Sequence, residues 1–457
     1  MAGKGQSGSN GEGRRLVLFA TPLQGHITPM LQLASLLHSK GFCITIIHTN
    51  FNSPDPSDYP DFSFESISDG LPTDKVSSIT SDFIAFSTAL NRNCEEPFRD
   101  RLKRLVSDQR SDRIACVIDD GNMQFVPAVA NELKVPRILF LINSAASLAV
   151  YFSFPMLKEK GYLPIKDPQS DVPIVDFPPL RIKDIPDIGS DDPDAWFQIV
   201  AEALRKVNSS SAIFWNTYDY LEGTNLSKIK QDLQVPIFTI GPVHKYPTYC
   251  SSSLLTAERS CLAWLDQQAP ASVIYVSFGS LACLEEEELV EAAWGLANSE
   301  QAFLWSLRPD SVRGSDSVEL PGDFEEKTIG RGRIVKWAPQ LEVLAHPSVG
   351  AFWTHCGWNS TLESICEGVP MLCWPSFGDQ RVNARYVSSV WKIGLQLDNG
   401  LKRGEVERAL RRIMTEKERE VLKGRAKELM ANAELSLTED GSSCRSLSGL
   451  VDHLMSL

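Results

Sequence analysis

The first fifty residues alternate between apolar runs and a helical pattern, and this order restricts the folds open to the chain. Residues 16–20 form an uninterrupted apolar run, which is typical of a strand buried on both faces of a parallel sheet. Residues 29–39 carry apolar side chains at helical spacing, and Gly41 separates them from a second apolar run at 42–48. A strand, a helix and a second strand in succession predict a βαβ unit, with residues 21–26 in the turn before the helix.

Similar runs recur along both halves of the chain. Candidate strands lie at residues 115–118, 138–142, 213–216 and 237–242 and, after a serine-containing stretch at 244–255, at 273–278, 302–306, 333–337, 349–353, 370–373 and 393–397. We expect helices at 80–106 and 285–296 and irregular structure at 164–193. A chain of 457 residues is too long for one ordinary core. The sequence therefore predicts an α/β fold of two Rossmann-like domains that face a cleft.

Charge and composition limit the partners of the chain. A formal net charge of -13 argues against binding to a nucleic-acid backbone or an anionic membrane. Four polar side chains interrupt the most apolar stretch, 138–157, so it does not suit a bilayer span. The 10 cysteines stand singly, a usage that suits the reducing cytosol. We expect a cytoplasmic monomer with a disordered N-terminus at 1–13, and neither nucleic acid nor membrane as a partner.

Residues 337–380 are rich in side chains that can hold a nucleotide and a sugar. A strand-like run leads into a turn that carries His355, Asn359, Ser360 and Glu363. The start of a helix presents unpaired backbone N–H groups and the positive end of its dipole, which suit an anion such as a diphosphate. The alternative is structural, with Asn359 or Ser360 as the N-cap and Ser360 and Glu363 as a capping box.

The two ends of this block offer groups for a base and for a sugar. Trp337 can stack on a flat base and Gln340 can pair with its edge, although a lone Trp can also be a core residue that closes a strand. Asp379 and Gln380 provide a carboxylate and an amide, a suitable pair for sugar hydroxyls. The alternative for Asp379 is a cap on the helix that follows.

A candidate acid–base pair lies in the first half of the chain. His26 follows a buried strand, and its imidazole titrates near neutrality, so it can take a proton from an attacking hydroxyl. Asp119 and Asp120 end another strand of the same expected sheet. Ligands bind where the carboxyl ends of such strands meet, so either carboxylate could contact His26 there.

Together these residues resemble the donor-binding signature of plant family-1 UDP-glycosyltransferases. The match runs from Trp337-Ala338-Pro339-Gln340 to Asp379-Gln380, and Gln24-Gly25-His26-Ile27 and Ser277-Phe278-Gly279-Ser280 also fit. Within the family the chain most resembles the subgroup with cytokinin N-glucosyltransferases and steviol glycoside glucosyltransferases. The resemblance implies the GT-B fold. Its expected parts are a disordered N-terminus (1–13), an acceptor-binding Rossmann-like domain (14–243), a linker (244–260), a UDP-sugar-binding Rossmann-like domain (261–435) and a C-terminal helix that packs back on the first domain (436–457).

The resemblance also implies how the donor is held. The implied contacts are to uracil from Trp337, Ala338 and Gln340, to the diphosphate from Ser280, His355, Gly357, Asn359 and Ser360, to the ribose from Glu363, and to the 3- and 4-hydroxyls of the sugar from Asp379 and Gln380. Gln380 and Trp358 tend to accompany glucose as the donor sugar. Asn143 stands where the family often has Thr, a position that can reach the sugar 6-hydroxyl.

The same resemblance implies the chemistry. His26 matches the catalytic base, and Asp120 matches its partner, because the family's Asp precedes an aromatic residue by five positions and Phe125 fits that spacing. The acceptor oxygen or nitrogen would attack the anomeric carbon of UDP-glucose, and UDP would leave with inversion. This scheme needs no metal and no other cofactor. Asp192-Pro193-Asp194 matches a D-x-D metal motif only superficially, because no strand precedes it.

The acceptor pocket should be built by the first half of the chain. The candidate residues are Leu23, Phe83, Phe86, Leu90, Phe125, Leu148, Phe152 and Trp196. Each of them suits a core equally well. An apolar pocket fits a planar or terpenoid small molecule, such as a flavonoid or other phenol, a cytokinin or a diterpenoid.

Two rival functions follow from other features. A nicotinamide oxidoreductase would explain two Rossmann-like halves, but neither first turn contains G-x-G-x-x-G. A non-catalytic nucleotide-sugar binding protein would share the donor block, but it would not need both His26 and Asp120. The sequence therefore favours an inverting UDP-dependent glucosyltransferase, with another UDP-sugar as the alternative donor.

Overall fold

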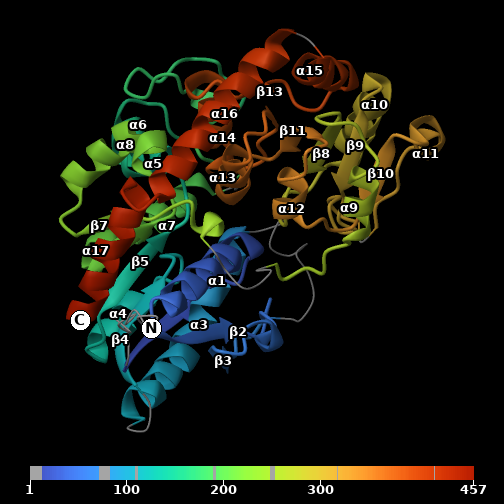
Figure 1. The fold of residues 1–457 in the computed structure, drawn as a ribbon. Coiled ribbons are helices and arrows are strands. Elements are labelled where there is room, and N and C mark those ends of the chain that lie inside the picture. Colours follow the sequence, from blue (N-terminus) through green and yellow to red (C-terminus); the bar gives the residue numbers. More distant parts are fainter. Residues whose placement is uncertain are drawn as a thin grey trace.

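The computed structural model describes residues 13–71, 83–108, 112–188, 192–246, 253–315, 317–415 and 417–457. Within these residues the chain forms two parallel sheets, each with helices packed on both faces (Figure 1). The α/β class and the two-domain arrangement agree with the prediction. Most of the N-terminus expected at 1–13, residues 247–252 of the expected linker and residues 80–82 of an expected helix lie outside the described part.

The first sheet has the strand order β3-β2-β1-β4-β5-β6-β7. Its strands are β1 Arg14–Phe19, β2 Cys43–Thr49, β3 Ser63–Ile67, β4 Arg113–Asp119, β5 Arg137–Leu141, β6 Ala212–Trp215 and β7 Ile237–Thr239. Its helices are α1 Gln24–Ser39, α3 Phe83–Ser107, α4 Val126–Glu132, α5 Ala145–Phe152, α6 Phe154–Glu159, α7 Pro193–Arg205 and α8 Asp219–Asp232. The central strands are buried on both faces, as their apolar runs predict.

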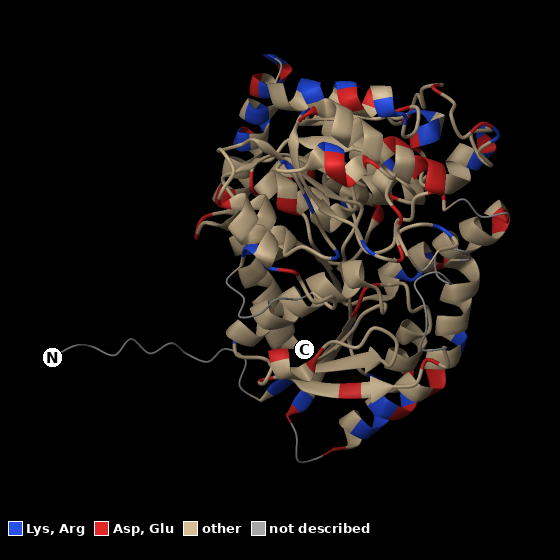
Figure 2. Cartoon of the chain, turned by 90° about the vertical axis from the view of Figure 1, so that its right-hand side faces the viewer, with Lys and Arg blue, Asp and Glu red and all other residues tan. Residues whose placement is uncertain are grey.

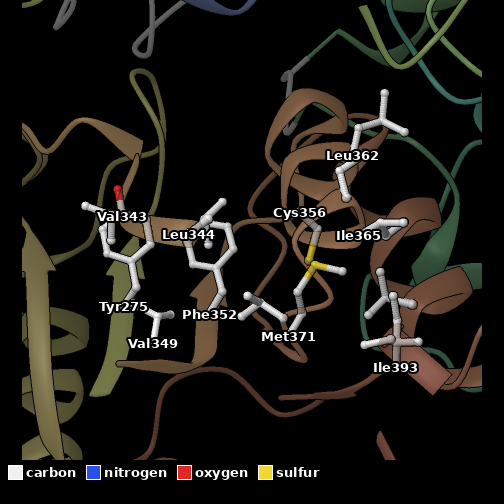
Figure 3. Packing of buried hydrophobic residues seen from close by; sticks show 14 of the residues in the cluster. Tyr275, Val343, Leu344, Val349, Phe352, Cys356, Leu362, Ile365, Met371 and Ile393 are labelled. Carbon is white, nitrogen blue, oxygen red and sulfur yellow. The ribbon is translucent and has the colours of Figure 1, made fainter. Parts of the chain in front are cut away.

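The second sheet has the strand order β10-β9-β8-β11-β12-β13. Its strands are β8 Val273–Ser277, β9 Ala302–Ser306, β10 Gly332–Val335, β11 Val349–Thr354, β12 Met371–Cys373 and β13 Gly394–Gln396. Its helices are α9 Ser260–Leu265, α10 Glu286–Ser299, α11 Phe324–Thr328, α12 Gln340–Leu344, α13 Trp358–Cys366, α14 Gln380–Arg385 and α15 Arg403–Thr415. Figure 3 shows one face of this core, where the rings of Tyr275 and Phe352 stack with centroids 5.0 Å apart and Leu362 and Ile365 of α13 pack nearby.

The last two helices connect the domains. Helix α16, Lys417–Leu437, packs on both α13 and α8, and α17, Ser442–Ser456, then lies against β7 and β4 of the first domain (Figure 1). Leu447, Leu450 and Leu454 of α17 are buried in the core of that domain. The chain therefore ends on the domain in which it begins.

Charged residues of both signs lie mainly on the outer helices and loops (Figure 2). In the described part of the chain, no helix is long and apolar enough to span a membrane. The cysteines described by the structure are free thiols.

Three local features differ from the prediction. Helix α1 begins at Gln24 and not at residue 29, so His26 lies in its first turn and not in a preceding loop. Strand β3 was not expected, because it is a partly exposed edge strand with only Ile67 buried and hence lacks an apolar run. Helix α13 begins at Trp358 with Gly357 as its N-cap, so Ser360 is neither a cap nor part of a capping box.

Candidate active site

The carboxyl ends of both sheets open onto one cavity. In each sheet the strand order changes direction once, between β1 and β4 in the first and between β8 and β11 in the second. Ligands of open parallel sheets bind at such positions. A cavity of about 1220 Å³ lies there, lined by residues of both domains.

His26 and Asp120 contact each other at the first of these positions. His26 Nδ1 lies 3.0 Å from Asp120 Oδ2, which also accepts the N–H of Thr21 at 2.7 Å. Burial acts to raise the pKa of Asp120, but the charge of His26 and the hydrogen bonds from His26 and Thr21 hold it below its ordinary value. The carboxylate therefore stays ionised at neutral pH and orients Nδ1–H. This leaves Nε2 of the partly exposed imidazole as the basic atom.

The adjacent carboxylate has a different partner. Arg137 Nε and Nη2 donate to the two oxygens of Asp119 at 2.6 and 2.9 Å, and both side chains are almost completely buried. The N–H of Gly121 also donates to Asp119 at 3.0 Å. Of the two carboxylates that the sequence left open, Asp120 is the one that contacts His26.

The turn between β11 and α13 faces the opposite side of the cavity. Among the described residues no side chain caps α13, and its N-cap is Gly357, so the first-turn N–H groups keep the positive end of the helix dipole uncovered. The His355 ring lies between two glycines, because a Cβ at Gly279 or Gly357 would come within 2.6 Å of it. Burial lowers the pKa of His355 to about 4, so the ring is neutral. His355 Nδ1 and Asn359 Oδ1 are buried with no partner in the described residues.

A wall of hydrogen-bonded side chains continues from this turn. Gln340 Nε2 donates to Ser360 Oγ at 2.9 Å and to Glu363 Oε2 at 2.7 Å. Burial raises the pKa of Glu363 to about 7, opposed in part by Gln340. Trp337 is only partly buried and lines the cavity, and its Nε1 donates to Ser253 Oγ at 3.0 Å. Trp337 therefore presents ring surface to the cavity and does not close a core.

Asp379 and Gln380 stand at the start of α14. Gln380 Oε1 accepts the N–H groups of Ser376 at 2.9 Å and Phe377 at 3.3 Å, so its NH₂ group is the end left for a ligand. Burial raises the pKa of Asp379 to about 6, while a hydrogen bond from Asn383 acts in the opposite direction. Both residues line the cavity.

The remaining donor-side candidates border the same cavity. Ser280 follows the turn after β8, and Ala338 is buried, with its N–H donating to Ser306 Oγ at 3.3 Å. Trp358 packs on the first domain, since its Nε1 donates to the carbonyl of Asn216 at 2.8 Å. Asn143 also lines the cavity, after the end of β5. The structure thus brings together every donor-side residue proposed from the sequence.

The apolar candidates for an acceptor pocket divide into two groups. Those that line the cavity are Leu23, Phe83, Phe86, Leu90, Leu148 and Trp196. Phe125 instead packs in the core, with its ring centroid 5.5 Å from that of Phe98. Phe152 packs against the core formed by β5, β6 and α8. Phe125 is the N-cap residue of α4 and Phe152 is the last residue of α5, and both side chains pack in the core and not against the cavity.

Several residues in or directly behind the cavity wall were not identified from the sequence. Thr21 holds Asp120 with both its N–H and its hydroxyl, and Tyr151 lines the cavity near Gly378. Asn383 is fully buried, and its Nδ2 donates to Asp379 Oδ2 at 3.2 Å. Ser253 accepts Nε1–H of Trp337 from within the expected linker (244–260). The position of Thr21 directly after a buried strand was a usable signal, and so was the spacing of four residues between Asp379 and Asn383.

The D-x-D sequence has a structural explanation. Asp192 is the N-cap of α7 and accepts the N–H of Ala195 at 3.0 Å, and Pro193 is the first residue of the helix. Asp194 pairs with Lys158 at 2.9 Å. Across the residues that the structure describes, no group of three or more His, Cys, Asp or Glu side chains could hold a metal ion.

The strand ends of two Rossmann-like domains surround one cavity, and in it an uncovered helix N-terminus lies opposite a His–Asp pair. These features define a nucleotide-sugar transferase of the GT-B fold. The comparisons with known proteins agree. The model of the family "UDP-glucoronosyl and UDP-glucosyl transferase" matches residues 38–423. The chain belongs to this family and is a glycosyltransferase that uses a UDP-sugar, as the sequence analysis predicts.

Similar proteins cover nearly the whole chain. UDP-glycosyltransferase 76B1 of Arabidopsis thaliana is 45% identical over 442 residues, which are 96% of this chain and 98% of that protein. DIMBOA UDP-glucosyltransferase BX9 of Zea mays is 40% identical over 98% of both chains. Among solved structures, Phytolacca americana UGT2 complexed with UDP-2fluoro-glucose and pterostilbene has a TM-score of 0.79 and 28% identity over 96% of this chain and 98% of its own. Os79 from O. sativa in complex with UDP has a TM-score of 0.81 and 27% identity over 96% and 100%.

Proposed function

We propose that the protein transfers glucose from UDP-glucose, with inversion, to a hydroxyl or nitrogen of a small lipophilic plant metabolite. One observation carries this proposal. The His26–Asp120 pair, at 3.0 Å, lines the same cavity as the uncovered start of α13. A base on one domain and an anion site on the other are what a direct displacement at a sugar–phosphate bond needs.

The donor would lie along the C-terminal domain. Trp337 would stack on uracil while Gln340 and the backbone of Ala338 contact its edge, and Glu363 would accept the ribose hydroxyls. The diphosphate would occupy the start of α13, where Ser280, His355, Gly357, Asn359 and Ser360 gather. The uncovered N–H groups and the dipole at the start of α13 support this placement.

The sugar would lie between α14 and the first domain. Asp379 would accept hydrogen bonds from sugar hydroxyls, and the NH₂ group of Gln380 would donate one, because its oxygen is already used by the backbone. Asn143 would approach from the end of β5. The NH₂ end of Gln380 and the tendency of Trp358 to accompany glucose support glucose over other sugars.

In the reaction, Nε2 of His26 takes the proton of the acceptor as its oxygen or nitrogen bonds to the anomeric carbon. The bond from that carbon to the β-phosphate oxygen breaks, and its electron pair leaves with UDP. Asp120 stabilises the imidazolium, because its carboxylate is ionised and hydrogen-bonded to Nδ1. The dipole of α13 stabilises the charge that develops on the diphosphate. No step in this proposal uses a metal.

The acceptor would bind in the apolar part of the cavity. Leu23, Phe83, Phe86 and Trp196 are among the side chains that line the cavity. The names of similar proteins refer to acceptors of this kind, namely DIMBOA and the anthocyanidin of an anthocyanidin 3-O-glucosyltransferase. These comparisons support a small aromatic or otherwise lipophilic acceptor for this chain.

A mass-spectrometric screen of lipophilic alcohols, phenols and amines with UDP-glucose, UDP-galactose and UDP-xylose tests the proposal. We expect product from UDP-glucose foremost, and we expect His26→Ala to lower turnover by about 100-fold or more, the range for loss of a general base. His38→Ala, on the exposed far end of the same helix, is the matched control and should retain full turnover. Unchanged turnover of His26→Ala would refute the mechanism, and a preference for another UDP-sugar would refute the choice of glucose.

A further inference from the structure

The first turn of α1, which carries His26, is hydrogen-bonded to a distant part of the chain through Gln24. Gln24 Oε1 accepts the N–H of Leu254 at 2.9 Å. Gln24 Nε2 donates to Thr28 Oγ1 at 2.8 Å, within the same helix. The carboxamide thus uses one end inside the helix and the other on a segment that follows the N-terminal domain in sequence.

Leu254 belongs to a segment that is fixed beside Trp337. The neighbouring Ser253 accepts Nε1–H of Trp337 at 3.0 Å. Four residues beyond Leu254, the N–H of Glu258 donates to the carbonyl of Trp337 at 2.8 Å. Two bonds therefore hold this segment to Trp337, one to its ring and one to its backbone. Gln24 connects the segment to the helix of His26.

A second hydrogen bond joins the first turn of α1 to the C-terminal domain, and Pro29 makes it possible. In an α-helix the N–H at position 29 would donate to the carbonyl of Gly25, but Pro29 has no N–H. That carbonyl instead accepts Nδ2–H of Asn359, in the first turn of α13, at 2.8 Å. No side chain caps α1. The start of the helix is thus held to the linker segment through Gln24 and to the C-terminal domain through Gly25, the two residues directly before His26.

We propose that Gln24 is a positioning residue, which aligns His26 with the donor by tying the first turn of α1 to the segment that holds Trp337. This inference rests on the proposed role of His26 as the base. Asp120 fixes only the Nδ1 side of the imidazole, so the location of Nε2 also depends on where the helix turn lies. A shift of about 1 Å in a reacting group can cost about 100-fold in rate.

Gln24→Met tests this role, because methionine keeps the length of the side chain and removes both hydrogen bonds. We expect kcat to fall by about 5- to 100-fold, while the Kd for UDP measured by calorimetry stays within about twofold. Gln24→Glu keeps an acceptor oxygen for Leu254 and should recover part of the loss. Ser253→Ala removes the hydrogen bond to the Trp337 ring. The fall in kcat of the double variant with Gln24→Met should be smaller than the product of the two single effects.

Gln267→Met is the matched control, since this exposed amide donates only to the carbonyl of Ala263 beside α9, and it should retain wild-type kcat. A wild-type kcat for Gln24→Met contradicts the positioning role. So does a Kd for UDP that weakens as much as kcat falls, because Gln24 would then be a donor contact. A Gln24→Glu protein as slow as Gln24→Met contradicts the bond to Leu254 as the cause. If His26→Ala also turns over normally, the proposed function itself fails; if His26→Ala is inactive, only the inference about Gln24 fails.

Discussion

At the end of β4 two adjacent carboxylates contact different partners, and this difference decides their roles. Successive side chains of a strand point to opposite faces of the sheet. Asp119 therefore reaches Arg137 on one side, and Asp120 reaches His26 on the other. Each carboxylate is satisfied by hydrogen bonds, but of the two only Asp120 contacts the imidazole of His26.

Asparagine substitutions at the two positions should separate stability from catalysis. Asp119→Asn leaves a buried guanidinium without its charge partner, so we expect the free energy of unfolding in urea to fall by about 3–5 kcal/mol. Asp120→Asn removes the charge that stabilises the imidazolium, so we expect kcat to fall by about 100- to 10,000-fold with a smaller loss of stability. Urea unfolding and steady-state kinetics on both variants check this pair. Equal effects of the two substitutions on kcat would contradict it.

Residues that act within one contiguous stretch were predictable, and residues that depend on distant packing were not. The donor block could be predicted because a single strand, turn and helix carry most of its groups. The core positions of Phe125 and Phe152 could not be separated from pocket positions, because an apolar side chain gives the same pattern in either place. Asn383 was not identified. Its contact with Asp379 spans only four positions, but its contact with the carbonyl of Cys356 forms only in the folded chain.

At the scale of elements, apolar runs located the strands of both sheets apart from the exposed edge strand β3. The sequence pattern predicted that α1 starts at residue 29, because proline is typical of the first turn of a helix. The helix starts five residues earlier, at Gln24. The helix can start there because the carbonyl of Gly25, which receives no N–H from Pro29, accepts a hydrogen bond from Asn359. These two residues lie 334 positions apart. A single sequence contains no local signal for that contact.

Glu222 holds the start of one helix from inside another. It lies at a kink in α8, is almost completely buried and accepts the N–H groups of Ala145 at 2.8 Å and Ala146 at 3.0 Å, as well as the hydroxyl of Thr217. Burial raises the pKa of Glu222 to about 7, although these hydrogen bonds act in the opposite direction. Helix α5 follows Asn143, so this carboxylate supports one edge of the cavity.

The contribution of Glu222 to stability should be measurable as a pH dependence of the free energy of unfolding. The folded pKa is about 7 and lies above the unfolded value of about 4.3, so the folded protein binds the proton more tightly. Its contribution to stability is therefore fully present below about pH 4.3 and is lost as the pH rises to about 7. We expect the free energy of unfolding of the wild type, relative to Glu222→Gln, to fall by about 2–3 kcal/mol between pH 5 and pH 7. A difference that does not change with pH in urea titrations would contradict this role.

At the scale of the whole molecule, buried polar contacts join the domains around the cavity. Arg385 of α14 donates to Asp184 of the first domain at 3.0 Å, and Ser144 Oγ donates to Asn383 Oδ1 at 2.7 Å. A few residues beyond Asp184, the carbonyl of Asp187 accepts the N–H of Gly378 at 2.7 Å. The loop that contains Asp184 is thus bonded to the chain directly before Asp379.

Asp184→Asn should weaken these contacts between the domains. The substitution removes the negative charge between Arg181 and Arg385 in a buried place, so we expect a loss of about 1–3 kcal/mol in unfolding free energy. Because the same loop borders Asp379, the KM for UDP-glucose should rise by about 10-fold, equivalent to about 1.4 kcal/mol. Asp194→Asn breaks an exposed pair within the first domain and should cost no more than about 1 kcal/mol, without a change in KM. Urea unfolding and donor kinetics distinguish two roles of Asp184. A role at the domain interface changes both the unfolding free energy and the KM for UDP-glucose, whereas a purely local role lowers stability and leaves KM unchanged.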